Sequence, residues 1–540
     1  MEFTELIKTS KVDNVVLLRH GVQQITGTLC LTSHHIIFGD RFSEEIMILY
    51  LFIEHLEKII TPSNSLLTII CKDLTSFKLR IPKEEDAVNV VLSIEALSAL
   101  ESAASYYPYY VNRINFNIES DGWALFDMKT EYSNIIGEFK TWKISNINAK
   151  HEICLSYPGL VIVPSNATNE MIKKSAKFRH GGRFPVLCYL HSNGVPLMRS
   201  SQPLNGPSNK RCKEDEKLLS FPISAHIKKG HIIDTRSQQA ASSHRSKGGG
   251  FEESDHYSQW KQTYHNIEPY TYLSESLSKL YDACIDKKNS AWLSKLEASG
   301  WLSYVQSVLI AASNTARHLH YEASPTLVHG EKGTDCTLLV TSLAQILLDY
   351  RCRTVIGLQS LITREWIWAG YPFTERHLKI GVSSFKRKEQ APVFLMFLDC
   401  LHQIMNQYAS SFEYTEDMLL LLAEHVYASQ YGTFLFNNQL QREQSKVTER
   451  TVSLWSYMNR QEMNGILYNP IYEENKSILS PSVSPQSLWV WEKMFRKTSY
   501  ECKSVKEALV SVKKDNSLLK KSAKQLQLDY EHLRAQFAAG

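Results

Sequence analysis

The stretch VHGEKGTDCT, residues 328–337, decides which fold and which chemistry the rest of the chain should be compared with. The residues before it predict a short strand over 326–329, and those after it predict an apolar helix from about 337 to 348. A loop that leads from a strand into a helix N-terminus binds anions, because free backbone N–H groups and the positive end of the helix dipole meet there. The sequence therefore predicts a phosphate cradle.

This cradle lacks the side chains that phosphoryl transfer needs. In cysteine-dependent phosphatases the strand ends in a Cys whose thiolate the helix N-terminus stabilises, and an Arg six positions later clamps the phosphoryl oxygens. Here Gly330 stands at the Cys position and Cys336 at the Arg position, while Lys332 cannot serve as a carboxylic acid. We interpret the segment as a degenerate phosphate loop that consists of His329, Gly330, Glu331, Lys332, Gly333, Thr334, Asp335, Cys336 and Thr337.

Two enzymatic alternatives fit the loop poorly. Cys336 falls in the first turn of the predicted helix, but its offset of six residues from Gly330 places it where the clamp belongs, not below the phosphorus. The loop also lacks the Gly-Lys-Ser/Thr spacing of a nucleotide-binding P-loop. We therefore assign no catalytic residue.

Length and composition indicate an ordinary soluble, intracellular protein. The 540 residues suggest two to four domains at about 150 residues each. A net charge of +4 gives no reason to expect nucleic-acid binding. The ten cysteines form no C-x-x-C pair, so neither a zinc site nor a disulfide framework is expected, and we predict no metal and no cofactor. Neither a secretory signal nor an apolar run long enough to cross a membrane is evident.

Residues 1–105 are predicted to form a small β domain closed by a helix. Strand patterns occur at 14–18, 27–31, 36–38, 46–53, 66–71 and 77–81, and helical periodicity follows over 84–100. Such an order resembles a barrel of the pleckstrin-homology type, with a linker at 101–112. Its basic residues Arg19, Lys72, Lys78, Arg80 and Lys83 are ordinary surface charges or, alternatively, contacts to an anionic membrane.

Residues 113–497 have the mixed pattern of an α/β domain. Apolar helices are expected at 391–406 and 416–431, and the stretches 201–217 and 235–250 are predicted to be surface loops. The run Gly248-Gly249-Gly250 is expected to form a flexible surface turn, because no strand pattern precedes it.

Residues 498–540 contain neither Pro nor Gly before the last position and predict one long helix. Alternating three- and four-residue steps define an apolar seam of Val505, Leu509, Val512, Asn516, Leu519, Ala523, Leu526, Tyr530, Leu533 and Phe537. Unpaired, this stripe would face water, so we favour a coiled coil over a single solvated helix. The polar Asn516 is typical of a position that selects partner and register.

The loop and its flanks resemble those of the myotubularin family. Active members carry His-Cys-Ser-Asp-Gly-Trp-Asp-Arg-Thr where this chain has residues 329–337, and the chain resembles the catalytically inactive members. Matching flanks extend over nearly the whole length: FRHGGRFPVL (178–187), RSSQP (199–203), KGGGF (247–251), WLSKLEAS (292–299), VTSLAQI (340–346), PVFLMFLDC (392–400), GTFL (432–435) and SLWS (453–456).

The resemblance implies a PH-GRAM domain, a phosphatase-like domain and a C-terminal coiled coil. Active relatives remove the 3-phosphate from phosphatidylinositol 3-phosphate and phosphatidylinositol 3,5-bisphosphate. Inactive members pair with active ones through the coiled coil, and the implied partners are the active myotubularin-related proteins 6, 7 and 8. The three catalytic positions map to Gly330, Lys332 and Cys336, so no catalytic role carries over.

We therefore expect a catalytically inactive regulatory subunit that raises the activity of an active partner. Pairing of the seam with a second copy stays open. The alternative is a phosphoinositide-binding adaptor that acts without a phosphatase. Either function predicts a cytoplasmic protein with peripheral attachment to endomembranes.

Overall fold

The computed structural model describes residues 3–18, 24–40, 45–62, 65–73, 75–98, 120–223, 229–285, 290–378, 390–427 and 429–495. The expected linker at 101–112, the charge Arg19 and the whole coiled-coil seam lie outside these residues. None of the helices in the described part of the chain combines the length and the hydropathy that a membrane span requires.

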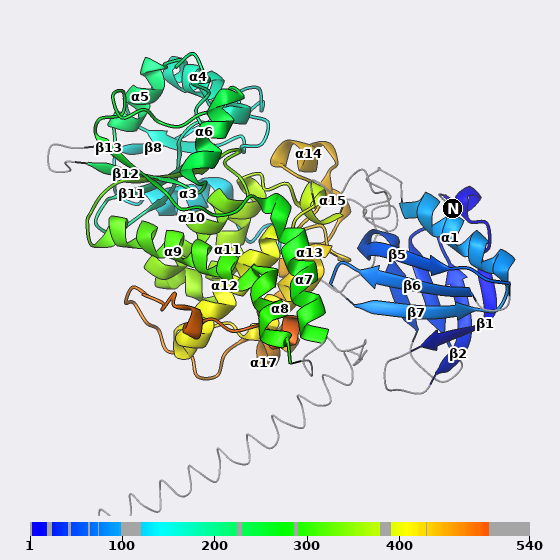
Figure 1. The fold of residues 1–540 in the computed structure, drawn as a ribbon. Helices are drawn as coiled ribbons and strands as arrows, with labels where there is room; N and C mark the ends of the chain where they lie inside the picture. The colour runs from blue at the N-terminus through cyan, green and yellow to red at the C-terminus, as the bar shows by residue number, and fades with distance from the viewer. Residues whose placement is uncertain are drawn as a thin grey trace, which may run out of the picture.

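An antiparallel seven-stranded sheet forms the N-terminal part of the described chain, shown in blue in Figure 1. Its spatial order is β4-β3-β2-β1-β7-β6-β5. Helix α1 (Glu84–Ser98) packs on this sheet and buries Val90, Val91 and Ile94 in the same apolar core as the strands. The strands are β1 (Lys11–Leu18), β2 (Ile25–Leu31), β3 (His35–Gly39), β4 (Ile46–Leu49), β5 (Ile53–Ile59), β6 (Ser65–Cys71) and β7 (Ser76–Ile81).

The expected single strand at 46–53 is wrong. The chain turns through a short 3₁₀ segment, η2 (Tyr50–Phe52), so that β4 and β5 lie at opposite edges of the sheet order. The Tyr50 hydroxyl donates to the Thr32 carbonyl at 3.0 Å and fixes this turn. Tyr50 and Leu51 are buried like strand residues, so the apolar sequence over 46–53 does not reveal the turn.

A five-stranded sheet at the centre of the second part carries the loop. Its order is β10-β11-β14-β12-β13; β10 is antiparallel to β11, and the other neighbouring pairs are parallel. All five residues of the central strand β14 (Thr326–Gly330) are buried. The other strands are β10 (Val186–Leu190), β11 (Pro196–Ser201), β12 (Gly230–Asp234) and β13 (Trp260–Tyr264), and β8 (Trp142–Ser145) pairs with β9 (Val161–Pro164) in a small separate sheet.

Helices surround the central sheet (Figure 1), and α9, α10 and α12 contribute many of their side chains to one large core. The helices are α3 (Met128–Ile136), α4 (Asn169–Phe178), α5 (Lys213–Ser220), α6 (Gln238–Ser246), α7 (Leu273–Ile285), α8 (Trp292–Ser299), α9 (Trp301–His320), α10 (Cys336–Leu348), α11 (Val355–Ile362), α12 (Val393–Gln407), α13 (Glu416–Tyr427), α14 (Gln439–Gln444), α15 (Val447–Arg450), α16 (Leu454–Met458), α17 (Asn464–Leu467) and α18 (Glu492–Phe495).

Both expected polar loops contain helix. The stretch 201–217 runs into α5, and 235–250 contains α6, whose N-cap Ser237 accepts from the Ala240 N–H at 3.1 Å. The expected flexible glycine turn is also wrong, because Gly249 and Gly250 are buried. A Cβ on Gly249 would lie 2.6 Å from the Gln202 side chain, so close packing requires a glycine there.

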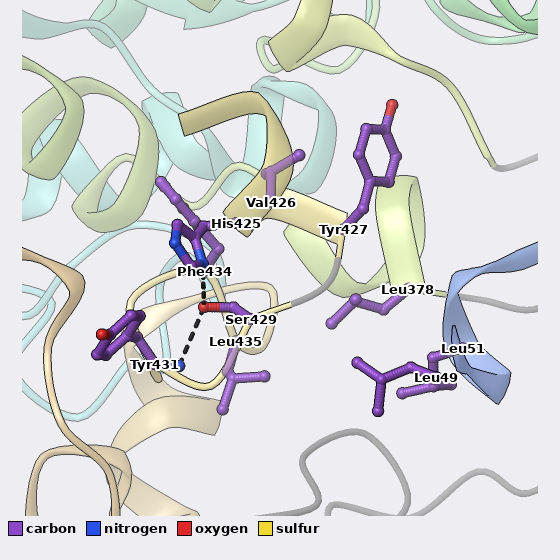
Figure 2. A pocket seen from close by; sticks show the side chains of 10 residues that line it. All are labelled: Leu49, Leu51, Leu378, His425, Val426, Tyr427, Ser429, Tyr431, Phe434 and Leu435. Atoms are coloured by element: carbon purple, nitrogen blue, oxygen red, sulfur yellow. Dashed lines mark hydrogen bonds between the residues drawn. The ribbon is translucent and has the colours of Figure 1, made fainter. Parts of the chain in front are cut away.

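The two parts meet through apolar contacts and one buried cation. Figure 2 shows Leu49 and Leu51 of the β4–η2 corner near Leu378 in a small pocket between the parts. Lys72, expected on the surface, is buried and donates from Nζ to the His377 carbonyl at 2.6 Å. Burial lowers the pKa of Lys72 to about 8, against the attraction of Glu54. It is therefore not a membrane-facing charge.

A degenerate phosphate loop

The strand–loop–helix arrangement that the sequence predicts is present. Strand β14 ends at Gly330, and α10 begins at Cys336, one residue earlier than expected. Two positive φ angles shape the turn, 69° at Gly333 and 46° at Asp335. A Cβ on Gly333 would collide with the Ser200 carbonyl, so this position requires glycine.

Gly330 presents no side chain at the end of the strand. A Cβ built there would lie 2.6 Å from Thr235 Oγ1 and 3.6 Å from Thr337 Oγ1. The Thr337 hydroxyl is buried and has no hydrogen-bond partner among the described residues. The space where a nucleophile would stand is therefore bordered by the hydroxyls of Thr235 and Thr337.

The thiol of Cys336 is unsuited to attack. Its sulfur is partly buried and lies 3.5 Å from the Tyr304 hydroxyl and 3.9 Å from the Glu268 carbonyl. Burial raises the pKa of Cys336 to about 12, although the contact with Tyr304 opposes the rise. At neutral pH this residue is a protonated thiol, and it carries no charge to clamp an anion.

Lys332 places a cation within the loop. Its Nζ donates to the Tyr270 hydroxyl at 3.3 Å and lies 5.5 Å from the centre of that ring. Burial alone would lower the pKa of Lys332, but the interaction with Tyr270 raises it above the ordinary value. The ammonium group stays charged and cannot donate a proton at neutral pH.

A buried arginine that the sequence did not single out lies against the loop. Arg376 belongs to the π-helical segment η7 (Thr374–Leu378), and its Nε donates to Asp335 Oδ1 at 2.8 Å. Its guanidinium also lies over the Tyr270 ring, 3.9 Å from the centre. Because Asp335 neutralises it, Arg376 does not replace the clamp that is missing at Cys336. The segment has no motif that would have identified it.

Other loop residues bind the surrounding scaffold. The Gln202 N–H donates to the Glu331 carbonyl at 3.2 Å, and the Thr334 hydroxyl donates to Asp335 Oδ2 at 2.8 Å. Arg183, from the FRHGGRFPVL stretch, donates to the Gly333 carbonyl at 2.8 Å. The turn is thus held by hydrogen bonds from its neighbours.

His329 anchors a buried chain of charges beneath the loop. Its Nε2 lies 2.8 Å from Glu252 Oε2, Arg179 Nη1 lies 2.5 Å from Glu252 Oε1, and Arg179 Nη2 lies 2.6 Å from Asp215 Oδ2. Burial would raise the pKa of Glu252, but His329 and Arg179 hold it far below its usual range. We interpret the chain as structural, because each charge in it faces a partner.

One group of side chains in the described ranges could be considered for a metal: His231, His318 and Glu322. His231 Nε2 and His318 Nδ1 lie 3.1 and 3.0 Å from Glu322 Oε2. The two rings stack with centroids 3.6 Å apart and planes 12° apart. Both ring nitrogens face the same carboxylate oxygen, and two N–H donors can share it.

Comparison with known proteins accounts for this combination of scaffold and loop. Residues 106–443 match the myotubularin-like phosphatase domain, and residues 11–98 match the GRAM domain of MTMR6-9. The chain belongs to the myotubularin family. It is 46% identical to mouse myotubularin-related protein 9 over 94% of each chain, and 45% identical to the human protein over 94% of this chain and 93% of the relative.

Similarity extends to relatives that are named as enzymes. Human phosphatidylinositol-3,5-bisphosphate 3-phosphatase MTMR6 is 34% identical over 97% of this chain and 86% of its own length. Human phosphatidylinositol-3-phosphate phosphatase MTMR7 is 34% identical over 95% and 80%. Family membership and a multidomain α+β architecture with a GRAM-type sheet are therefore confirmed for this myotubularin.

Proposed function

We propose that this myotubularin is a catalytically inactive regulatory subunit. It binds an active myotubularin phosphatase and increases the removal of the 3-phosphate from phosphatidylinositol 3-phosphate and phosphatidylinositol 3,5-bisphosphate. The observation that carries the proposal is Gly330, which leaves the end of β14 without a nucleophile in a loop that keeps the strand–turn–helix backbone.

Three chemical roles are missing together. Gly330 cannot attack phosphorus, the protonated Cys336 cannot clamp equatorial oxygens, and Lys332 cannot protonate a leaving group. Loss of a nucleophile alone lowers turnover by a factor on the order of 10⁶ in well-studied hydrolases. We therefore propose a pseudophosphatase whose contribution is made through a partner.

We propose that the partner binds the coiled coil of residues 498–540, which follows a GRAM-type domain at 1–105 and a phosphatase-like domain at 113–497. The candidates are the active myotubularin-related proteins 6, 7 and 8, and a second copy of this chain competes for the same seam. The names of MTMR6 and MTMR7 identify lipid 3-phosphatases, which fits an active partner from this branch of the family.

The seam offers a sharp test, because leucines occur both on it and beside it. We expect L519D/L526D to abolish co-purification with each active relative and the stimulation of its lipid phosphatase activity. The matched variant L518D/L528D changes two leucines that lie off the seam, and it should retain both properties. Equal behaviour of the two variants would contradict pairing through this seam, and unchanged activity of the partner in the intact complex would contradict regulation.

Lipid binding by the GRAM-type sheet is the second candidate function. Lys78 and Arg80 alternate along β7 with buried residues and remain half-exposed, and Lys83 is exposed, which favours an anionic surface on this side. The attachment would be peripheral, on endomembranes. Binding of the full chain to vesicles that contain phosphatidylinositol 3-phosphate, lost in K78E/R80E/K83E but retained in K129E/K140E/K150E, would support it. Absence of binding at low salt would reject it.

A further inference from the structure

The segment 477–491, here called the C-terminal strap, crosses the helical core without regular secondary structure apart from η11 (Pro485–Ser487). Side chains of the core hold it by its backbone. Gln407 binds both the N–H and the carbonyl of Ser482, at 2.7 and 3.0 Å, and Gln403 does the same for Trp489, at 3.0 and 2.7 Å. The strap is therefore fixed from one side, which leaves its other side to solvent.

The strap contains two Ser-Pro dipeptides four residues apart, Ser480-Pro481 and Ser484-Pro485. Proline-directed protein kinases recognise this dipeptide, because the ring that follows the acceptor serine fits a pocket that excludes a backbone N–H donor. By sequence alone the two serines are equivalent acceptors.

The fold distinguishes them. Ser480 is exposed, but its Pro481 is buried, so a kinase cannot reach the ring without displacing the strap. Ser484 and Pro485 are both exposed. Ser484 is also extended, with φ −68° and ψ 147°, which is the conformation that a residue before proline favours and that a substrate adopts in an extended binding groove.

We propose that Ser484 is a phosphorylation site for a proline-directed serine/threonine kinase that uses Mg²⁺-ATP. Ser484 Oγ attacks the γ-phosphorus, and the bond from that phosphorus to the β–γ bridging oxygen breaks. ADP leaves, and the hydroxyl proton passes to the kinase's catalytic carboxylate. Ser480 is shielded by the burial of Pro481.

Phosphate at this position changes the strap locally. Ser484 Oγ lies 3.2 Å from Ser482 Oγ and 3.0 Å from Ser487 Oγ, and Ser487 Oγ donates to Ser482 Oγ at 2.8 Å. A phosphoryl group adds a charge of about −1.5 to −2 and three acceptor oxygens, so the hydrogen bonds within this triangle of hydroxyls must rearrange. The Ser487 N–H, which bonds the Ser484 carbonyl at 2.9 Å, becomes more exposed to exchange.

The test uses the intact chain, a purified proline-directed kinase and Mg²⁺-ATP, with phosphosites assigned by mass spectrometry. We expect phosphate on Ser484, at least tenfold more than on Ser480. S484A should lose at least nine-tenths of the phosphate incorporated into the strap, whereas S480A should retain it. Serines 482 and 487, which precede no proline, provide matched controls as S482A and S487A, and each should behave like S480A.

A synthetic peptide of residues 476–491 separates the effect of the fold from that of the motif. In the peptide both Pro481 and Pro485 are accessible, so we expect both Ser480 and Ser484 to be phosphorylated. Equal labelling of the two serines in the intact chain, or no labelling of Ser484 there, would overturn the proposal. Faster hydrogen exchange at the Ser487 amide after phosphorylation should accompany the modification.

Discussion

Asp335 binds the guanidinium of Arg376 through both carboxylate oxygens, with Nε–Oδ1 at 2.8 Å and Nη2–Oδ2 at 3.1 Å. Both side chains are buried, so each charge depends on the other. Burial alone would lower the pKa of Arg376, but Asp335 raises it well above its ordinary value, which keeps the guanidinium charged. In this chain the pair maintains the shape of the loop.

We expect D335N to lower the free energy of unfolding by about 3 kcal/mol, because it leaves Arg376 buried without its counter-charge. Urea unfolding followed by tryptophan fluorescence measures the change. R376M/D335N, which removes both charges, should recover part of the loss. A double variant that is less stable than D335N would contradict the pairing as the cause.

The two loop glycines should respond differently to alanine. At Gly330 the one short contact of the added Cβ is with the hydroxyl of Thr235, at 2.6 Å, so G330A should cost about 1–3 kcal/mol and T235A should relieve most of that cost. At Gly333 the Cβ meets the Ser200 backbone and φ is 69°, so G333A should cost more and no side-chain change should relieve it. Thermal unfolding of G330A, T235A, G330A/T235A and G333A tests both statements. Equal costs at the two positions would contradict the geometry.

Restoring the nucleophile alone should not restore catalysis. In G330C the new thiol lacks a clamp at 336 and an acid at 332, so phosphate release from phosphatidylinositol 3-phosphate should stay at least about 10³-fold below that of an active relative. Malachite-green detection of phosphate checks this, with C336A as the control for any activity of the native thiol. Substantial turnover by G330C would show that the rest of the loop is catalytically sufficient.

The C-terminal end of the described fold should be sensitive to acid through Glu416. Burial raises the pKa of Glu416, but hydrogen bonds from His402, Lys493 and Trp491 lower it to about 2, below the ordinary value of about 4.3. Its contribution to stability is therefore complete above about pH 4.3 and is lost as the pH falls toward 2. E416Q should lower stability at pH 7 by about 1–2 kcal/mol and reduce the loss over that interval. Urea unfolding at pH 7, 4.5 and 3 measures it, and an unchanged pH profile in E416Q would refute the assignment.

Lys72 should produce a pH trend of the same sign, a stability that rises with pH, but at alkaline pH. Its folded-state pKa of about 8 lies below the ordinary value of about 10.4, so the unfolded chain binds more protons between these values and stability rises with pH across them. K72M should abolish this rise, while K78M, a half-exposed lysine on β7, should not. The free energy of unfolding of K72M and K78M, measured from pH 7.5 to 10.5, shows whether the rise with pH depends on Lys72.

The sequence predicted what local patterns encode and missed what depends on distant contacts. The strand, the turn and the helix around 328–337 were predictable, because the apolar strand, Gly333 and the apolar helix are contiguous. The turn at Tyr50 was not, because a buried corner has the same apolar residues as a buried strand. Helix α6 was missed because its only strong signal is the cap Ser237 in a polar stretch.

The residues of the loop and its surroundings likewise differ in whether a local pattern or a distant contact defines them. The interpretation of Gly330, Lys332 and Cys336 rests on their spacing and stays a prediction, whereas Arg376 reaches Asp335 across 41 residues and carries no motif of its own. The burial of Lys72 depends on a carbonyl 305 residues away, so no pattern within the first domain could show that this charge is internal.

His377 and Arg376 are neighbours along the chain, but they form contacts with different parts of the molecule. The carbonyl of His377 receives Lys72 from the N-terminal sheet, while the side chain of Arg376 receives Asp335 from the turn. One short backbone segment thus carries both a contact between the two parts of the fold and the ion pair that supports the turn.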